Sequence, residues 1–186
     1  MLKRFLAFAA IAIVAFGVLG GCDSNGDQQR SVVTVTSINC NGPGYADVAD
    51  STGALRETWV PVYMYNRPYN GLVVTDPASP HGEFQVTAYR ITWTTAGGTQ
   101  TMPARLEETS FSIPTGSEVG AMIRLVSLGE LTSPLLSGLV GGGTETMVAH
   151  FTFYGHETGT DRETEVTATV TVVFANYVDS EPTCTL

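Results

Sequence analysis

The strongest constraint on the fold of this chain is an alternation of apolar and polar side chains with a period of two. It is clearest at residues 147–154 and 166–175, where the inward positions are Met147, Ala149, Phe151, Phe153, Val166, Ala168, Val170, Val172 and Phe174. Successive side chains of a β-strand point to opposite faces. The alternation therefore predicts two strands, each with one buried face, joined as a hairpin by the polar residues 155–163.

Shorter runs of the same kind occur earlier, at residues 31–38, 58–65, 84–93, 101–107, 110–113 and 119–125. In residues 84–93 the apolar phase changes between Ala88 and Tyr89, which predicts a β-bulge or a switch between sheets. Pro103 confines its run to a sheet edge. Residues 40–53 are rich in Gly, Asp and Asn and predict a loop, and residues 131–140 predict a short helix or a packed loop.

Together these runs predict an all-β fold, a single antiparallel β-sandwich of about seven or eight strands. The sequence shows no internal repeat, heptad or long amphipathic helix. The pattern resembles that of immunoglobulin-like and fibronectin-III-like domains. This resemblance is one of strand pattern only, and no motif identifies a narrower family.

The first residues of the chain have the organisation of an export signal. Residues 1–4 are short and basic, residues 5–18 are an unbroken apolar run, and Leu19-Gly20-Gly21-Cys22 follows. Such a run is too short for a comfortable membrane span, which needs about 20 residues. The last four residues resemble the bacterial lipobox. The resemblance implies cleavage before Cys22 and acylation of Cys22, with palmitate among the chains. The alternative is an ordinary signal peptide or an uncleaved anchor.

We therefore expect three parts: a signal peptide (1–21), a lipidated cysteine with a flexible tether (22–30) and a β-sandwich domain (31–186). The tether contains no apolar residue after Cys22, and its reach is about 16 Å. The domain would thus lie close to a membrane of the cell envelope. Asp23 resembles the inner-membrane retention signal of enteric bacteria. Because that rule is not general, the inner and outer membranes and both faces of the outer membrane stay open.

The charge of the mature chain excludes one class of partner. Lys3 and Arg4 leave with the signal peptide, so the remainder has seven Arg, no Lys and 18 acidic residues, a net charge of −11. Nucleic-acid binding needs a basic patch, so no nucleic-acid partner is expected. Anionic lipid headgroups would also repel this surface, so the lipid would hold the protein at the membrane.

Two cysteines remain once Cys22 is acylated, and the compartment is oxidising. Cys40 and Cys184 lie just after the first and last strand-like segments. In an immunoglobulin-like sandwich these strands can run parallel as neighbours. We therefore predict a Cys40–Cys184 disulfide; the alternative is two unpaired thiols.

The run 58–65 carries the candidate ligand-binding residues. Trp59, Tyr63 and Tyr65 share one of its faces, and Tyr69 follows in the next loop. Exposed, such a row could stack on sugar rings or contact a partner. The other face, with Val60, Val62 and Met64, would then be core. The alternative is a central strand covered on both sides.

Metal binding and catalysis have weaker support. One candidate metal site, for zinc or calcium, consists of His150, His156, Glu157, Asp161 and Glu163. A second, for calcium, consists of Asp47 and Asp50. Neither spacing matches a known ligand pattern. Solvent exposure explains them, so we expect no metal and no cofactor. There is no Gly-x-Ser-x-Gly motif. Glu107 and Glu108 are adjacent on a strand and would point apart.

These observations favour a non-enzymatic interaction or structural module, held at the envelope by lipid, with another envelope protein as its partner. The first alternative is a lipoprotein that binds a glycan or small ligand through the aromatic row. The second is a hydrolase with an unrecognised site. The oligomeric state is open.

Overall fold

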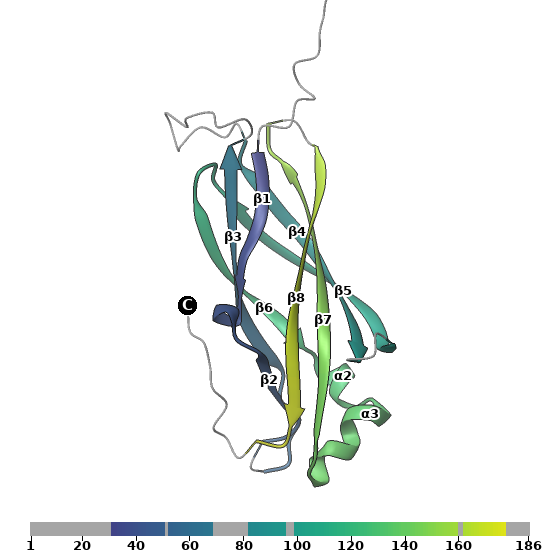
Figure 1. The fold of residues 1–186 in the computed structure, drawn as a ribbon. Coiled ribbons are helices and arrows are strands. Elements are labelled where there is room, and N and C mark those ends of the chain that lie inside the picture. Colours follow the sequence, from purple (N-terminus) through teal and green to yellow (C-terminus); the bar gives the residue numbers. More distant parts are fainter. Residues whose placement is uncertain (1–30, 51, 69–81, 96–98, 160–161, 178–186) are drawn as a thin grey trace, which may run out of the picture.

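A computed structural model describes residues 31–50, 52–68, 82–95, 99–159 and 162–177 (Figure 1). Within these ranges the chain forms eight strands in two sheets. The strands are β1 (Ser31–Ile38), β2 (Gly44–Asp47), β3 (Thr58–Pro68), β4 (Phe84–Thr95), β5 (Gln100–Ile113), β6 (Glu118–Val126), β7 (Thr144–Glu157) and β8 (Glu163–Ala175). The short helices are η2 (Asn39–Asn41), α2 (Leu128–Leu131), α3 (Pro134–Ser137) and η4 (Gly138–Gly141). The prediction of an all-β fold is confirmed.

The smaller sheet has the order β1-β3-β6, with β3 in the centre and both pairings antiparallel. The larger sheet has the order β2-β8-β7-β4-β5. The hairpin predicted from the strongest alternation is β7–β8, which pairs continuously from Thr144 with Ala175 to His156 with Glu163. Local side-chain period was sufficient to predict this hairpin because one of its faces is buried.

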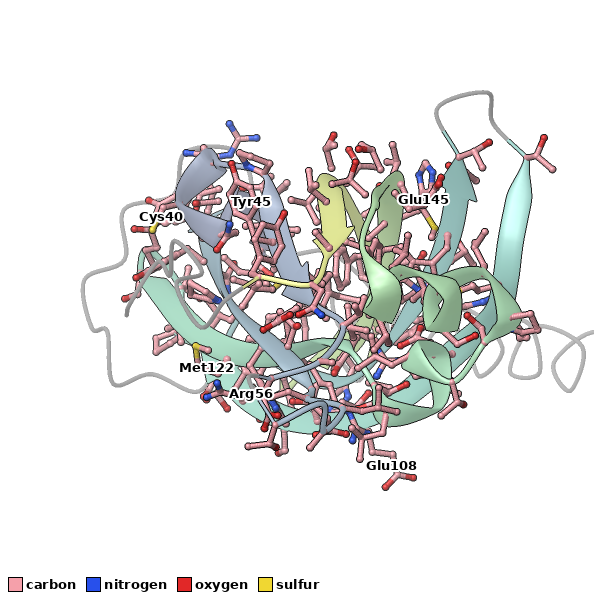
Figure 2. All side chains as sticks on the ribbon, turned by 90° about the horizontal axis from the view of Figure 1, so that it is seen from below. Cys40, Tyr45, Arg56, Glu108, Met122 and Glu145 are labelled. Carbon is pink, nitrogen blue, oxygen red and sulfur yellow. The ribbon has the colours of Figure 1, made fainter. Side chains whose placement is uncertain are left out.

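The two sheets curve around one hydrophobic core, which Figure 2 shows from below. The larger sheet contributes the fully buried rings of Trp93, Phe151, Phe153 and Phe174. The smaller sheet contributes Val62, Met64, Ile123 and Leu125. Because both sheets bury side chains in the same cluster, neither has a separate core.

The change of phase in residues 84–93 is a β-bulge in β4. Its register shifts between Val86 and Ala88 relative to both neighbouring strands. One extra residue there moves the inward face from Phe84 and Val86 to Tyr89 and Ile91, and all four are buried.

The structure corrects the predicted topology in two places. Residues 40–53 are not only loop, because they contain η2 and β2, and β2 pairs with β8 in parallel. The fold is therefore not purely antiparallel. The first strand, β1, pairs with β3 and not with the last strand. The alternation of residues 44–47 is too short to predict a strand, and backbone pairing with β8 makes it one.

The structure merges two predicted runs and resolves one ambiguity. Residues 101–107 and 110–113 belong to one strand, β5, which lies at the edge of its sheet as Pro103 predicts. The segment predicted as a short helix or packed loop, residues 131–140, contains α3 and most of η4 and begins at the last residue of α2. Ser127 and Ser133 cap α2 and α3 through their side chains.

The predicted signal peptide, Cys22, the tether, Tyr69, Asp161 and Cys184 lie outside the described residues. In the described ranges, no helix has the length and apolar character needed to cross a membrane.

Candidate functional site

The outer face of β3 carries the aromatic row noted in the sequence. Trp59 has 50% of its surface exposed, and Tyr63 and Tyr65 are partly exposed. The opposite face of the strand is buried in the core and carries Val60, Val62 and Met64. Three of the four candidate residues therefore lie at the surface on one strand; the fourth, Tyr69, is outside the described residues.

Strand β6 extends this surface. Arg124 lies opposite Trp59, and Met122 lies opposite Pro61. Directly opposed residues of an antiparallel pair share a face. Met122 is 43% exposed and points away from the core in Figure 2. We call the set of Trp59, Tyr63, Tyr65, Met122 and Arg124 the aromatic face.

Arg124 lies over the ring of Trp59. Its guanidinium carbon lies 6.0 Å from the centre of the indole ring, a cation–π distance. Arg124 is itself held, because its Nη1 donates to Glu57 at 2.7 Å and its Nε donates to Glu107 at 3.0 Å. One side of the indole is thus in contact with a side chain that has little freedom to move.

Arg124 and Glu107 stabilise each other's charged forms. Burial alone would raise the pKa of Glu107, but the hydrogen bond from Arg124 and the charges of Arg105 and Arg124 outweigh burial and lower this pKa. The hydrogen bond to Glu107 likewise raises the pKa of Arg124. Both groups are therefore ionised at neutral pH.

Arg105 carries the same network from one sheet to the other. It lies on β5, and its Nη1 is 2.6 Å from Glu107 Oε1. Its Nη2 donates to the backbone carbonyls of Arg124 and Leu125 on β6, each at 2.9 Å. Because β5 and β6 belong to different sheets, this side chain joins the sheets along one side.

Tyr89 and Glu130 extend this network of hydrogen bonds and ion pairs toward the core. The Tyr89 hydroxyl accepts from the Arg124 backbone N–H at 3.0 Å and donates to Glu107 at 3.2 Å. Burial, and next the charge of Glu107, raise the pKa of Tyr89 to about 12, so the hydroxyl stays neutral. Glu130 is buried, accepts from Trp93 Nε1 at 2.7 Å and lies 3.4 Å from Arg105 Nε.

We call the set of Glu57, Tyr89, Arg105, Glu107, Arg124 and Glu130 the arginine–glutamate cluster. Sequence reasoning considered only Glu107, and only to note that Glu107 and Glu108 point apart. In the structure Glu107 is mostly buried in the cluster while Glu108 is exposed. No local pattern could have found the cluster, because its members come from three strands (β4, β5 and β6), from α2 and from the residue before β3.

The two histidines of the last hairpin lie beside polar residues of the neighbouring strands. His150 Nε2 is 2.9 Å from Thr94 Oγ1, and His156 lies opposite Glu163 across the hairpin. Glu157 is 1% exposed and accepts from the Ser31 backbone N–H at 2.7 Å and from Ser31 Oγ at 2.6 Å. In the part of the chain that the structure describes, no three His, Cys, Asp or Glu side chains gather as metal ligands would.

Asp47, at the end of β2, and Asp50, three residues later, both accept hydrogen bonds from backbone N–H groups. Asp47 accepts from the backbone N–H groups of Ala49 at 3.3 Å and Tyr177 at 3.0 Å. Asp50 accepts from both the backbone and the hydroxyl of Thr52, and the hydroxyl hydrogen bond is the main cause that lowers the pKa of Asp50. Asp50 closes a local turn, whereas Asp47 also joins the end of β2 to the segment that follows β8.

Cys40 lies in η2, where Asn39, Cys40 and Asn41 all have positive φ angles. Cys184 is outside the described residues, so the Cys40–Cys184 pairing stays a prediction.

The sequence was compared with known proteins. No protein-family model matches it, and no curated protein does either.

Proposed function

We propose that this protein is an envelope lipoprotein, anchored through Cys22, that acts as a non-enzymatic interaction module with the aromatic face as its contact surface. The observation that carries the proposal is the half-exposed indole of Trp59, which lies against Arg124 on the outer face of β3. Its partner is another protein of the cell envelope.

The composition of the aromatic face supports a protein partner. Trp, Tyr, Met and Arg are enriched at protein interfaces, and Trp, Tyr and Arg provide most of the binding hot spots. The five residues named are of these types, and Pro61, Gly120 and Glu118 lie among them on the same face. A fixed indole also loses less side-chain entropy on binding than a free one. The contact of Arg124 with Trp59 would therefore favour tight association.

An immunoglobulin-like arrangement is part of the same proposal. It is supported by the shared core of the two sheets and by β2, which runs parallel to the last strand, β8. The short tether expected before Ser31 would hold this domain near the membrane surface. Fold alone does not define function.

A photo-cross-linking residue placed at Met122 in intact cells tests the proposal. We expect one dominant protein adduct at this position. The matched control is Thr167, an exposed residue on the outer side of β8, which should give none. Addition of Trp59→Ala to the Met122 variant should abolish the adduct without unfolding the protein. Equal adducts at both positions would contradict an assigned contact surface.

A glycan is the second candidate ligand. It is favoured by the spacing of Trp59, Tyr63 and Tyr65, which lie along one strand over about 20 Å at roughly 3.3 Å per residue. An extended polymer of rings fits such a row. In the same experiment, adducts that resist protease but are shortened by glycan-degrading enzymes would favour the glycan over a protein.

A further inference from the structure

The two ends of the aromatic face differ in how their charges are compensated. At the Trp59 end, the cation over the ring is Arg124, which is paired with two glutamates. At the other end, Glu118 lies on β6 directly opposite Tyr65. Glu118 is exposed and takes part in no ion pair with another described residue. Its negative charge is therefore left without a counter-charge in the described part of the chain.

A hydroxyl from the far side of the sheet holds Glu118 in place. Thr36 Oγ1 donates to Glu118 Oε1 at 2.5 Å and lies 3.1 Å from the carbonyl oxygen of Tyr63. Thr36 belongs to β1 and Glu118 to β6, which lie on opposite sides of β3. The two side chains therefore meet over β3, beside Tyr63 and Tyr65, and the carboxylate has a fixed place on the aromatic face.

The surroundings of this carboxylate suit a cation. Tyr63 and Tyr65 share one face of β3, and their positions are about 7 Å apart at 3.3–3.4 Å per residue. Aromatic rings attract ammonium groups that lie within about 6 Å of the ring centre. Gly120, directly opposite Tyr63, has no side chain that could cover this ring from β6. One cation beside Glu118 could thus form an ion pair and contact both partly exposed rings.

Arg67 is the nearest candidate within the chain for this place. It is exposed and lies on β3, two residues beyond Tyr65. Within the described ranges it forms no ion pair with Glu118, whose carboxylate is turned toward Thr36 and Tyr63. The place beside the two rings is therefore open to a cation from outside the chain.

We propose that Glu118, Tyr63 and Tyr65 form a cation subsite of the aromatic face, which binds the ammonium group of a lysine from the partner protein. The inference rests on the proposed function, because the same partner would cover Trp59. Lysine is favoured over arginine by the contact of Thr36 with Oε1, which leaves Oε2 as the unoccupied oxygen. An ammonium is a point charge that one oxygen can bind, whereas a guanidinium pairs best with both oxygens.

The sequence excludes a second copy of this chain as the source of the lysine. Lys3 is the one lysine in the sequence, and it leaves with the expected signal peptide. The net charge of the mature chain, −11, also opposes self-association and attracts a basic partner. A lysine that pairs with Glu118 must therefore belong to a different protein.

A zero-length carbodiimide tests the subsite in membranes from cells that produce the full lipidated chain. The reagent condenses a carboxylate with an amine that touches it; an amide bond forms, and the carboxylate oxygen leaves with the reagent as a urea. Mass spectrometry should find Glu118 joined to one lysine of the protein that photo-cross-links at Met122. A link from Glu118 to an ethanolamine headgroup, or no link while Met122 still gives its adduct, would overturn the proposal.

Matched glutamate variants separate the subsite from general attraction to an acidic protein. Glu118→Gln removes the charge and keeps an oxygen that can accept from Thr36. It should lower the yield of the photo-adduct at Met122 by ~5-fold or more, through the lost ion pair. Glu165→Gln, at an exposed residue on the outer side of β8, should change the yield less than ~2-fold. Equal losses in the two variants would contradict the proposal.

Variants of Tyr65 test the contact of the cation with a ring. Tyr65→Phe keeps the aromatic face of the side chain and should change the adduct yield less than ~2-fold, whereas Tyr65→Leu should lower it by ~3-fold or more. Arg67→Gln should not lower the yield. Equal yields for the two Tyr65 variants, or a loss in Arg67→Gln as large as in Glu118→Gln, would overturn the subsite.

Failure of the subsite and failure of the proposed function give different results. A Met122 adduct that Glu118→Gln leaves unchanged would refute the subsite and keep the aromatic face as the contact surface. Absence of any Met122 adduct in the parent chain would contradict the proposed function, and the carbodiimide link at Glu118 would then test the subsite by itself.

Discussion

At the scale of single residues, Arg124 connects the surface of this protein with its interior. It contacts the exposed ring of Trp59 on one side and the carboxylates of Glu57 and Glu107 on the other. Removal of Arg124 would therefore affect both the aromatic face and the contact between the sheets. Variants that separate these two roles must change its neighbours instead.

Variants of the two tryptophans, one exposed and one buried, form a matched pair that tests the exposure of the aromatic face. Trp59 is half exposed, whereas Trp93 is fully buried and donates to Glu130. Trp93→Ala should lower the free energy of unfolding by about 3–5 kcal/mol, and Trp59→Ala by only about 1 kcal/mol. Urea unfolding measures both. Quenching of fluorescence by acrylamide should remove the Trp59 signal first, and equal quenching of the two rings would contradict their assigned burial.

Glu107→Gln tests the arginine–glutamate cluster. It leaves Arg105 and the partly exposed Arg124 without their shared counter-charge, so we expect unfolding to become easier by about 1–3 kcal/mol. Glu108→Gln, one residue away and exposed, should change stability by less than about 0.5 kcal/mol. The midpoints of urea unfolding measure the stability of both variants. Equal losses of stability would argue against a structural role for the cluster.

The same carboxylate predicts an acid-dependent loss of stability. The folded-state pKa of Glu107 is below its ordinary value of 4.5, so its contribution is present above that pH and is lost as pH falls through the lower folded pKa. The decline of unfolding free energy below about pH 5 should be shallower in Glu107→Gln than in the parent chain. Parallel curves for the two proteins would show that Glu107 does not contribute.

At the scale of elements, η2 is the segment that transfers the chain from the smaller sheet to the larger one. β1 pairs with β3, and after η2 the chain continues as β2 beside β8. Asn39, Cys40 and Asn41 take positive φ angles, which non-glycine residues adopt at some cost and Asn tolerates best. A covalent link at Cys40 would stabilise this crossing.

Chain length permits the predicted Cys40–Cys184 disulfide. The Tyr177 N–H binds Asp47, which is seven residues from Cys40, and Cys184 is seven residues from Tyr177. Each of these two seven-residue stretches can span about 23 Å. Because both start from the contact between Asp47 and Tyr177, chain length allows Cys184 to reach Cys40. Mass spectrometry of unreduced peptides should find the link. Cys40→Ser should lower stability by at most about 5 kcal/mol, and two free thiols in the unreduced protein would contradict the prediction.

At the scale of the whole molecule, the contacts of Ser31 define where the domain would meet its tether. Its backbone N–H and its hydroxyl both donate to the buried Glu157 at the end of β7. This fixes the first described residue to the larger sheet, although β1 itself pairs in the smaller one. A force on the tether would therefore act on both sheets.

Cys22→Ser tests the proposed anchor. We expect the variant to lose its acyl groups and to stay in the supernatant when membranes are pelleted, whereas Ser24→Ala should pellet with the membranes like the parent. Labelling with radioactive palmitate followed by fractionation measures both properties. Retention of label in Cys22→Ser would contradict lipidation at this residue.

The amino-acid sequence by itself determined the features that depend on local side-chain period. The β7–β8 hairpin and the break of phase in β4 follow from which neighbours are apolar, and so does the face that Trp59, Tyr63 and Tyr65 share. The edge position of β5 follows from Pro103, which has no N–H to donate. The period of a strand is independent of its partners, so these features were predictable without a fold.

Only the tertiary structure decided the features that depend on partners distant in the chain. β2 is a strand because β8 lies beside it, and β1 pairs in the other sheet because the chain crosses at η2. Arg105, Glu107 and Arg124 form one cluster because the sheets bring β5 and β6 together. The same packing brings the Arg105 side chain of β5 to the backbone carbonyls of Arg124 and Leu125 on β6. Such contacts arise from the closure of long loops around a shared core, and the chain carries no local pattern that specifies them.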